Sequence, residues 1–238
     1  MSSTTTKSAF WLGVRDGSPF VLVVAPFAML FGVIATEAGL SVFETLVFSI
    51  AVIAGAAQFT ALQLMTENAP TVIILASALA VNLRMAMYSA ALTPHLGSAP
   101  LWQRALMAYL LVDQSYACSV AQYEKDPGMT IAQKVAFFFG TISPICPTWY
   151  AFTLIGALVG NQIPPEWGLD FVVPIAFLAL IAPMLRTASH LAAALVAILV
   201  ALLANGIPYS LGLMVAGISG MIAGAQVELW LKARGKWS

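Results

Sequence analysis

Residues 18–37 read SPFVLVVAPFAMLFGVIATE, an apolar stretch whose length and composition decide the fold class of this chain. A helix that crosses a bilayer needs roughly 20 consecutive, predominantly apolar residues. The stretch has 20 residues, and its first ionisable side chain is Glu37 at the end. Pro26 lies within it and predicts a break or kink in the helix. We therefore expect a membrane-spanning helix here.

The composition of the whole chain supports the same interpretation. Of 238 residues, 61% are apolar types and only 8% are charged, whereas a soluble domain carries about 25% charged residues. The formal net charge is zero, so the basic surface that marks a nucleic-acid-binding protein is not expected. Only a lipid environment can solvate so much apolar surface, and the composition predicts an integral membrane protein.

Further apolar stretches predict an all-α, polytopic bundle of about eight transmembrane helices, with seven as the alternative count. Besides 18–37 they cover 42–65, 70–93, 101–122, 132–160, 170–187, 190–205 and 207–230. The whole chain, 1–238, is expected to form a single transmembrane domain with a short N-terminal segment, 1–17, and a short tail, 231–238. Helix breaks are expected at Pro26 and at the pair Pro144 and Pro147.

The distribution of cations favours eight spans over seven. With the N-terminus in the cytoplasm, eight spans place all but two of the ten cations on the inside: Lys7, Arg15, Lys125, Lys134, Arg186, Lys232, Arg234 and Lys236. Arg104 falls outside and Arg84 lies within a span. Because cytoplasmic segments of membrane proteins are enriched in Lys and Arg, we predict that both termini are cytoplasmic.

Two ionisable residues, Arg84 and Asp113, fall inside predicted spans, where a charge costs about 2.5–3.5 kcal/mol on insertion scales. On a helix Arg84 and Tyr88 share a face, and Tyr109, Asp113 and Tyr116 share another at spacings of four and three residues. These spans therefore have polar sides that face protein or a wet cavity. Two interpretations stay open: a substrate or proton site, or an ion pair that only joins two helices.

Other polar and small residues within the spans have a structural alternative as well. Gln58 follows the small residues 54–57 and could bind a polar ligand or bond to a neighbouring helix. Gly212, Ala216, Gly220 and Gly224 recur every fourth residue and predict a close-packing face, either within the chain or against a partner.

The sequence contains no motif of a soluble enzyme. It lacks a phosphate-binding glycine loop, a His-Glu-x-x-His pair and a cysteine cluster. His95 and His190 have no carboxylate or thiol at metal-site spacing, and Cys118 and Cys146 do not form a disulfide framework. We therefore expect no enzymatic activity, no cofactor and no metal.

Several motifs in the first half of the chain resemble the AzlC-type exporters of branched-chain amino acids, the large subunits of the LIV-E family. The matching pieces occur in the family's order: Pro26-Phe27, Phe31-Gly32, Ala54-Gly55-Ala56-Ala57-Gln58-Phe59, Asn82-Leu83-Arg84, Met87-Tyr88-Ser89-Ala90-Ala91-Leu92, Asp113-Gln114 and Tyr116-Ala117. Two positions depart from the family pattern. Met85 replaces a frequent histidine, and Gln114 replaces a frequent glutamate, which removes a second carboxylate beside Asp113.

The resemblance implies a secondary transporter of the bacterial inner membrane that exports branched-chain or related apolar amino acids. It also implies a small membrane partner of the AzlD type and energy from an ion gradient, with the proton as the candidate coupling ion. We expect the substrate-binding or coupling residues to be Arg84, Asp113, Gln58, Asn82, Tyr88 and Gln114. The alternatives are a membrane channel, or a scaffold subunit for another small-molecule transporter.

Overall fold

The computed structural model describes residues 5–160, 185, 187–204, 206–207 and 211–234. These residues form helices joined by short turns, with no strand among them. The chain divides into two compact units, one built from Met1–Leu62 with Ala78–Trp167 and the other from Gln63–Ser77 with Gly168–Ser238. The prediction of an all-α membrane protein is confirmed.

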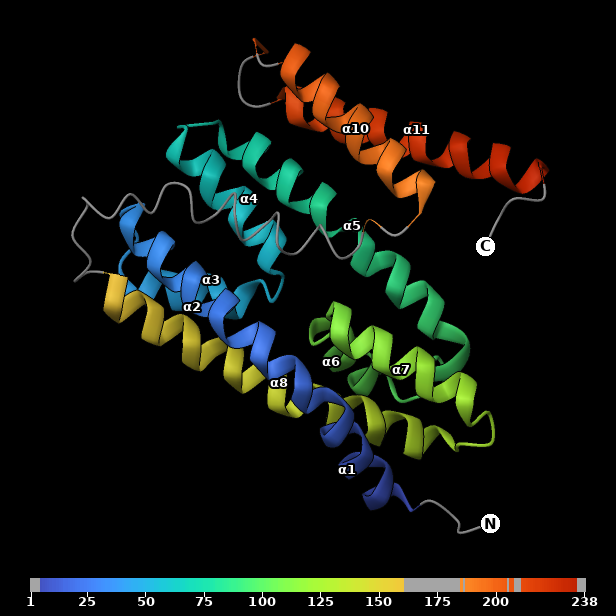
Figure 1. Ribbon diagram of the computed structural model, residues 1–238. Helices are drawn as coiled ribbons and strands as arrows, with labels where there is room; N and C mark the ends of the chain where they lie inside the picture. The colour runs from blue at the N-terminus through green and yellow to red at the C-terminus, as the bar shows by residue number, and fades with distance from the viewer. Residues whose placement is uncertain (1–4, 161–184, 186, 205, 208–210, 235–238) are drawn as a thin grey trace. The chain divides into compact units, whose positions relative to one another are not determined.

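The helices follow the predicted spans closely, with additional interruptions (Figure 1). In chain order they are α1 (Thr6–Gly17), the 3-10 helix η1 (Ser18–Phe20), α2 (Val21–Glu37), α3 (Val42–Ala51), α4 (Gly55–Thr66), α5 (Thr71–Leu96), α6 (Leu101–Tyr109), α7 (Asp113–Lys125), α8 (Ile131–Gly160), α10 (Ala188–Leu203) and α11 (Leu211–Ala233). Within the described residues, three continuous helical stretches are long and apolar enough to cross a bilayer: Thr6–Glu37, Thr71–Leu96 and Ile131–Gly160. Most of the predicted span 170–187 lies outside the described residues.

Helices α1 and α2 form one long stretch that packs side by side and in parallel with α8 (Figure 1). Glycines bring the two backbones together. A Cβ at Gly13 would overlap the carbonyl oxygen of Phe137, and a Cβ at Gly156 would overlap that of Met29. Because small residues let helix backbones approach closely in lipid, this glycine-mediated contact anchors the first unit.

The predicted helix breaks at Pro26, Pro144 and Pro147 are wrong. Pro26 lies inside α2, and both other prolines lie inside the 30-residue α8. A proline removes one backbone hydrogen bond, which neighbouring groups can replace in a membrane helix. The carbonyls that lose their backbone donor are those of Gly140 and Ser143, four residues before each proline, and close packing against α1 and α2 holds α8 in one piece.

The chain instead breaks at two sites without proline, inside the predicted spans 42–65 and 101–122. Residues 52–54 separate α3 from α4, and residues 110–112 separate α6 from α7. Val52 and Val112 have extended backbone angles, with φ of −132° and −134°. Neither predicted span is therefore a single helix.

Helices α3 and α4 both pack against α2. Phe48 on α3 and Phe59 on α4 both pack edge-on against Phe31 of α2, each at 5.6 Å between ring centroids. Gly55, the first residue of α4, abuts the Phe27 ring, one turn earlier on α2. Because α4 runs from the level of Phe27 toward the level of Phe31, it returns toward the end of α2 where α3 began. We call α3, residues 52–54 and α4 the first hairpin.

Helices α6 and α7 form the second hairpin, closed by residues 110–112. Three contacts show that α7 runs parallel to α5. Arg84 pairs with Asp113, Tyr88 stacks on Tyr116, and the His95 ring lies 5.3 Å from that of Tyr123. Since α6 connects the end of α5 to the start of α7, it must run in the opposite direction.

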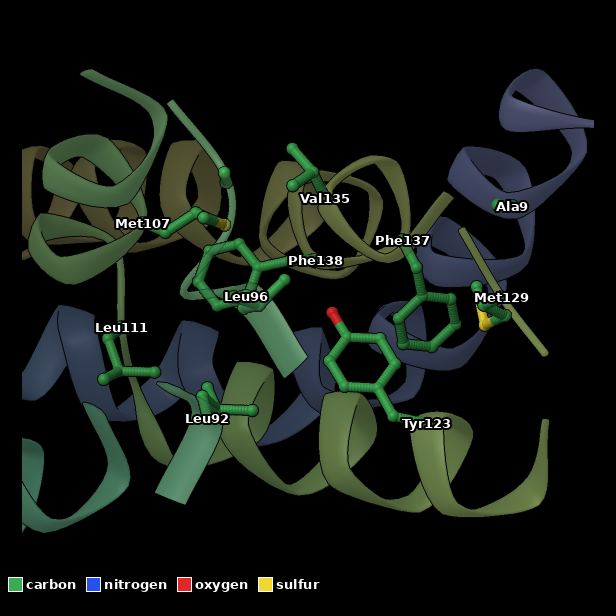
Figure 2. Close-up of a cluster of buried hydrophobic side chains, with 11 residues drawn as sticks. Ala9, Leu92, Leu96, Met107, Leu111, Tyr123, Met129, Val135, Phe137 and Phe138 are labelled. Carbon is green, nitrogen blue, oxygen red and sulfur yellow. The ribbon is translucent and has the colours of Figure 1, made fainter. Parts of the chain in front are cut away.

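A cluster of buried apolar side chains fixes the second hairpin to the ends of α1, α5 and α8 (Figure 2). Tyr123 of α7 packs against Phe137 of α8, and its hydroxyl donates to the Lys134 carbonyl at 2.7 Å. The other members are Ala9, Leu92, Leu96, Ala99, Met107, Leu111, Met129, Val135 and Phe138. This cluster therefore places the end of α5 beside the start of α8.

The tips of the two hairpins meet at the middle of α8. Ile53 from the first tip and Val112 from the second pack on one buried cluster that contains Ile145 and Trp149. The Tyr109 hydroxyl at the end of α6 donates to the Ile50 carbonyl at the end of α3, at 2.6 Å. The first unit thus has two interrupted helix pairs that converge on one point.

In the second unit, α10 and α11 pack as a pair. A Cβ at Gly212 would overlap the Ala204 carbonyl oxygen, and one at Gly220 would come 2.8 Å from the Ala193 oxygen. The small-residue face of the last predicted span therefore packs within the chain, against α10, which is the first of the two alternatives that the sequence left open.

Candidate functional site

The two charges that the sequence places inside predicted spans form an ion pair. Arg84 Nη1 lies 3.0 Å from Asp113 Oδ2, with the two side chains 35% and 42% exposed. Asp113 is the first residue of α7, where the positive end of the helix dipole favours a carboxylate. Arg84 Nε and Asp113 Oδ1 are buried atoms without a hydrogen-bond partner in the described chain. The pair is thus partly open and retains unused hydrogen-bonding capacity.

Two tyrosines flank this ion pair. The rings of Tyr88 and Tyr116 stack with their centroids 4.0 Å apart and an angle of 10° between planes. The stacked rings hold α5 and α7 together one turn beyond the charges, so that the ion pair is not the sole link between these helices.

Gln58 lies just after the break in the first hairpin, as Asp113 lies just after the break in the second. It lies in the first turns of α4 and is fully buried, and neither its amide oxygen nor its amide nitrogen has a partner in the described residues. Leaving such a group unsatisfied costs about 1–3 kcal/mol. Because helical side chains tilt toward the N-terminus of their helix, Gln58 leans over the first turn of α4, next to the break at 52–54.

Aromatic side chains surround the start of α4. Gly55 abuts Phe27 and Trp149, so that a Cβ there would overlap the Phe27 ring. The Trp149 indole nitrogen is a second buried donor without a partner in the described residues. Sequence reasoning missed Trp149, because a tryptophan inside an apolar span carries no local sign of a polar role.

The remaining predicted residues lie on the helices that carry the ion pair. Asn82 is half-buried on α5, and its amide oxygen has no partner in the described chain. Gln114 is half-buried beside Asp113 in the first turn of α7. No hydrogen bond or ion pair between described residues joins Gln58 or Asn82 to the Arg84–Asp113 pair. The structure therefore brings together Arg84, Tyr88 and Asp113, and leaves Gln58 on the other hairpin.

Tyr109 does not share a face with Asp113 and Tyr116, as a continuous helix would require. The break at 110–112 turns it away, and its hydroxyl bonds to Ile50 and lies 3.2 Å from the Tyr150 hydroxyl.

The start of a helix at Asp113 is visible in the sequence. An acidic residue in a first turn followed by Ser115, whose hydroxyl accepts from the Val112 amide at 3.0 Å, is typical of an N-terminus.

A cavity of about 290 Å³ lies between the C-terminal half of α5 and α6. Ser89, Thr93 and Arg104 line its polar side, and Leu111 and Phe138 its apolar side. Figure 2 shows the latter two within the buried cluster. The residues that line this cavity do not include Arg84 or Asp113, so the cavity is separate from the ion pair.

These features define a polytopic helical membrane protein with a charged pair held between an unbroken helix and an interrupted one. The chain belongs to the AzlC family, because the family model described as AzlC protein matches residues 19–163. The match covers both hairpins and every candidate residue described above.

Similar proteins are membrane proteins from bacteria and archaea. The chain is 25% identical over 231 residues to the inner membrane protein YgaZ of Escherichia coli, covering 94% of this chain and 91% of the relative. It is 27% identical over 190 residues to an uncharacterized membrane protein of Archaeoglobus fulgidus, with 78% and 80% covered. A Helicobacter pylori membrane protein is 27% identical over 165 residues, with 68% and 70% covered. No solved structure matches the chain.

Proposed function

We propose that this chain is a secondary active transporter that exports branched-chain or related apolar amino acids across a bacterial inner membrane, together with a small AzlD-type subunit. The observation that carries the proposal is the set of buried polar groups without a partner in the described chain, which lie on the two interrupted helix pairs and on the helices α5 and α8 beside them. Interrupted helices with polar groups at membrane depth commonly form the substrate sites of transporters.

An amino acid zwitterion with an apolar side chain fits these groups chemically. Its carboxylate needs hydrogen-bond donors, which the Gln58 amide, the first turn of α4 and the Arg84 guanidinium offer. Its ammonium needs an acceptor, which the free Oδ1 of Asp113 offers. Apolar and aromatic side chains such as Phe27 and Trp149 suit a branched aliphatic side chain. Asn82, Tyr88 and Gln114 complete the polar surroundings in this proposal.

Coupling to a proton gradient would place the transported proton on Asp113. The carboxylate is partly exposed and can exchange its guanidinium partner for a proton or for a substrate ammonium. Since Gln114 replaces the second carboxylate that the family often has, Asp113 is the one acidic group at this position. The energy source and the partner subunit both rest on the family resemblance.

Leucine counterflow in proteoliposomes tests the proposal. Vesicles containing this chain and a small membrane protein of the AzlD type from the same organism should accumulate labelled leucine against an internal leucine pool, with saturation at high concentration. Arg104→Gln, which removes an exposed cation away from the ion pair, should behave as wild type. Full activity without the partner would remove the two-subunit part of the proposal. Flux that never saturates would indicate a channel, and no flux of any apolar amino acid would contradict the transporter assignment.

A further inference from the structure

The direction of α7 decides how residues 101–125 pass through the membrane. A single crossing after α5 would carry the chain back to the opposite face, and α7 would then run antiparallel to α5. The contacts Arg84–Asp113, Tyr88–Tyr116 and His95–Tyr123 advance together along both helices, so α7 runs parallel to α5. The segment therefore returns to the end of α5 from which it started.

The start of α8 confirms this return. His95 Nδ1 near the end of α5 lies 3.5 Å from Lys134 Nζ in the first turn of α8. If residues 101–122 crossed the bilayer once, these two residues would lie on opposite faces, separated by about 30 Å of hydrocarbon.

We propose that residues 42–66 and 101–125 are two re-entrant hairpins, which enter the membrane from opposite faces and meet near its middle. Their arms have 10, 12, 9 and 13 residues. At 1.5 Å per residue, such arms reach about 13–20 Å, roughly half of the hydrocarbon thickness. The five crossings predicted for residues 1–160 become three, made by α1–α2, α5 and α8.

Burial of the hairpin tips supports this depth. Non-helical backbone is tolerated within a bilayer only where protein or a wet cavity surrounds it. Ala54 in the first tip and Leu111 in the second are buried, and both tips pack on the cluster around Ile145 and Trp149. The bond from Tyr109 to the Ile50 carbonyl joins the two tips directly.

The hairpin arrangement also places more of the cations on one side of the membrane than single crossings would. Ala9 shares a buried cluster with Tyr123 and Phe137, so the N-terminal end, the loop after α5 and the start of α8 lie at one face. Lys7, Arg15, Lys125 and Lys134 belong to that face, and Arg104 now joins them. In the single-crossing arrangement Arg104 was the exception. Every cation of residues 1–160 outside the ion pair then lies on one side, as the positive-inside rule favours.

Cysteine accessibility in the full chain with its partner tests the proposal. In a Cys118→Ala, Cys146→Ala background, four single variants report four loops: Leu40→Cys, Glu67→Cys, Ser98→Cys and Gly128→Cys. A membrane-impermeant maleimide is applied to intact cells and again after permeabilisation, with total thiols measured after denaturation. We expect Glu67→Cys to react together with Leu40→Cys, and Ser98→Cys to react together with Gly128→Cys. The readout is which loop cysteines react together, so the test does not require knowing which face is cytoplasmic.

The single-crossing arrangement gives the opposite pairing, with Ser98→Cys following Leu40→Cys, and that result would overturn the proposal. A second measurement guards against variants that misfold. A short bifunctional thiol-reactive reagent, such as a bis-methanethiosulfonate, should cross-link His95→Cys to Lys134→Cys within one molecule, with each thiolate displacing a sulfinate leaving group. It should not cross-link His95→Cys to Leu40→Cys, which lies at the other end of the long helices. A cross-link in the second variant without one in the first would likewise overturn the proposal.

Discussion

At the scale of single residues, the Arg84–Asp113 pair is neither deeply buried nor fully satisfied. A buried pair that only joins two helices is expected to bring its remaining hydrogen-bonding atoms to partners, because unsatisfied charged groups are costly in a low-dielectric environment. Here Arg84 Nε and Asp113 Oδ1 have none in the described residues, and over a third of each side chain is exposed. Stacking of Tyr88 on Tyr116 already joins the helices. These facts favour a functional pair over a purely structural one.

The double neutral variant Arg84→Gln with Asp113→Asn separates the two roles. We expect it to accumulate in the membrane nearly as well as wild type, because no charge is left unpaired, while leucine efflux falls at least tenfold. Efflux against imposed pH gradients, normalised to the amount of protein, is the measurement. The exposed pair Lys232 and Glu228 on α11, at 2.7 Å, supplies a matched control whose neutralisation should leave efflux intact. Transport near the wild-type rate by the Arg84→Gln, Asp113→Asn variant would instead support a structural ion pair.

Asp113→Asn alone tests proton coupling. The amide cannot titrate, so efflux by this variant should lose its dependence on the pH gradient even where some exchange of leucine persists. The comparison is gradient-driven efflux against counterflow in the same vesicles. Normal gradient-driven efflux by well-folded Asp113→Asn would exclude Asp113 as an obligatory proton carrier.

Gln58→Leu distinguishes a ligand-binding amide from one that bonds neighbouring helices. The Gln58 amide is fully buried and unpartnered in the described chain, so an apolar side chain of similar size should leave stability unchanged or raise it by about 1 kcal/mol. Transport should nevertheless fall at least tenfold. Thermal unfolding in detergent and counterflow are measured together, with Gln63→Leu, an exposed position on the same helix, as the control. A clear loss of stability in Gln58→Leu would point to a structural amide.

At the scale of elements, close packing through small residues joins α8 to α1 and α2, and α10 to α11. Helix α8 retains two prolines because its glycines bring it against α1 and α2 along most of its length. The hairpins break at residues 52–54 and 110–112, where the chain has no proline. A proline therefore does not mark where the described helices break.

Two glycines of α11 test the packing of α10 against α11. Gly220→Leu should disrupt this pair, because a Cβ there already meets the Ala193 oxygen and the Ala197 methyl group. Gly217→Leu should be tolerated, since no atom of the described residues beyond its own helix backbone lies within 4 Å of a Cβ at that position. We expect the first variant to unfold at a clearly lower temperature and the second to match wild type. Equal stability of the two variants would contradict the observed pairing of α10 with α11.

At the scale of the whole molecule, re-entrant hairpins change the number of crossings without changing where the ends of the chain lie. Replacing five crossings by three in residues 1–160 keeps an odd number, so the predicted side of the C-terminus is the same. After residue 238, we expect a reporter that works only in the cytoplasm to be active. After residue 162, we expect activity only from a reporter that works outside the cytoplasm. A periplasmic C-terminus would show that the sequence-based count of the last spans is wrong.

The sequence by itself determined the class of protein and most of the candidate site. Long apolar stretches predict membrane helices because the requirement for about 20 apolar residues is local. Arg84 and Asp113 were identifiable because a charge in such a stretch needs a partner or water, and the structure shows that they pair. The motifs around Gln58, Arg84 and Asp113 also carried the resemblance that the family match confirms.

Only the tertiary structure decided how the chain runs between those residues. Hydropathy measures how apolar a stretch is and contains no information on its direction, so residues 101–122 look the same whether they cross once or turn back. The turn at 110–112 depends on contacts from far along the chain, among them Ile50, Ile145 and Trp149. Likewise, the loss of one hydrogen bond at Pro144 is visible in the sequence, whereas the packing that keeps α8 intact is not. Local composition selects membrane helices, and long-range packing selects their breaks and directions.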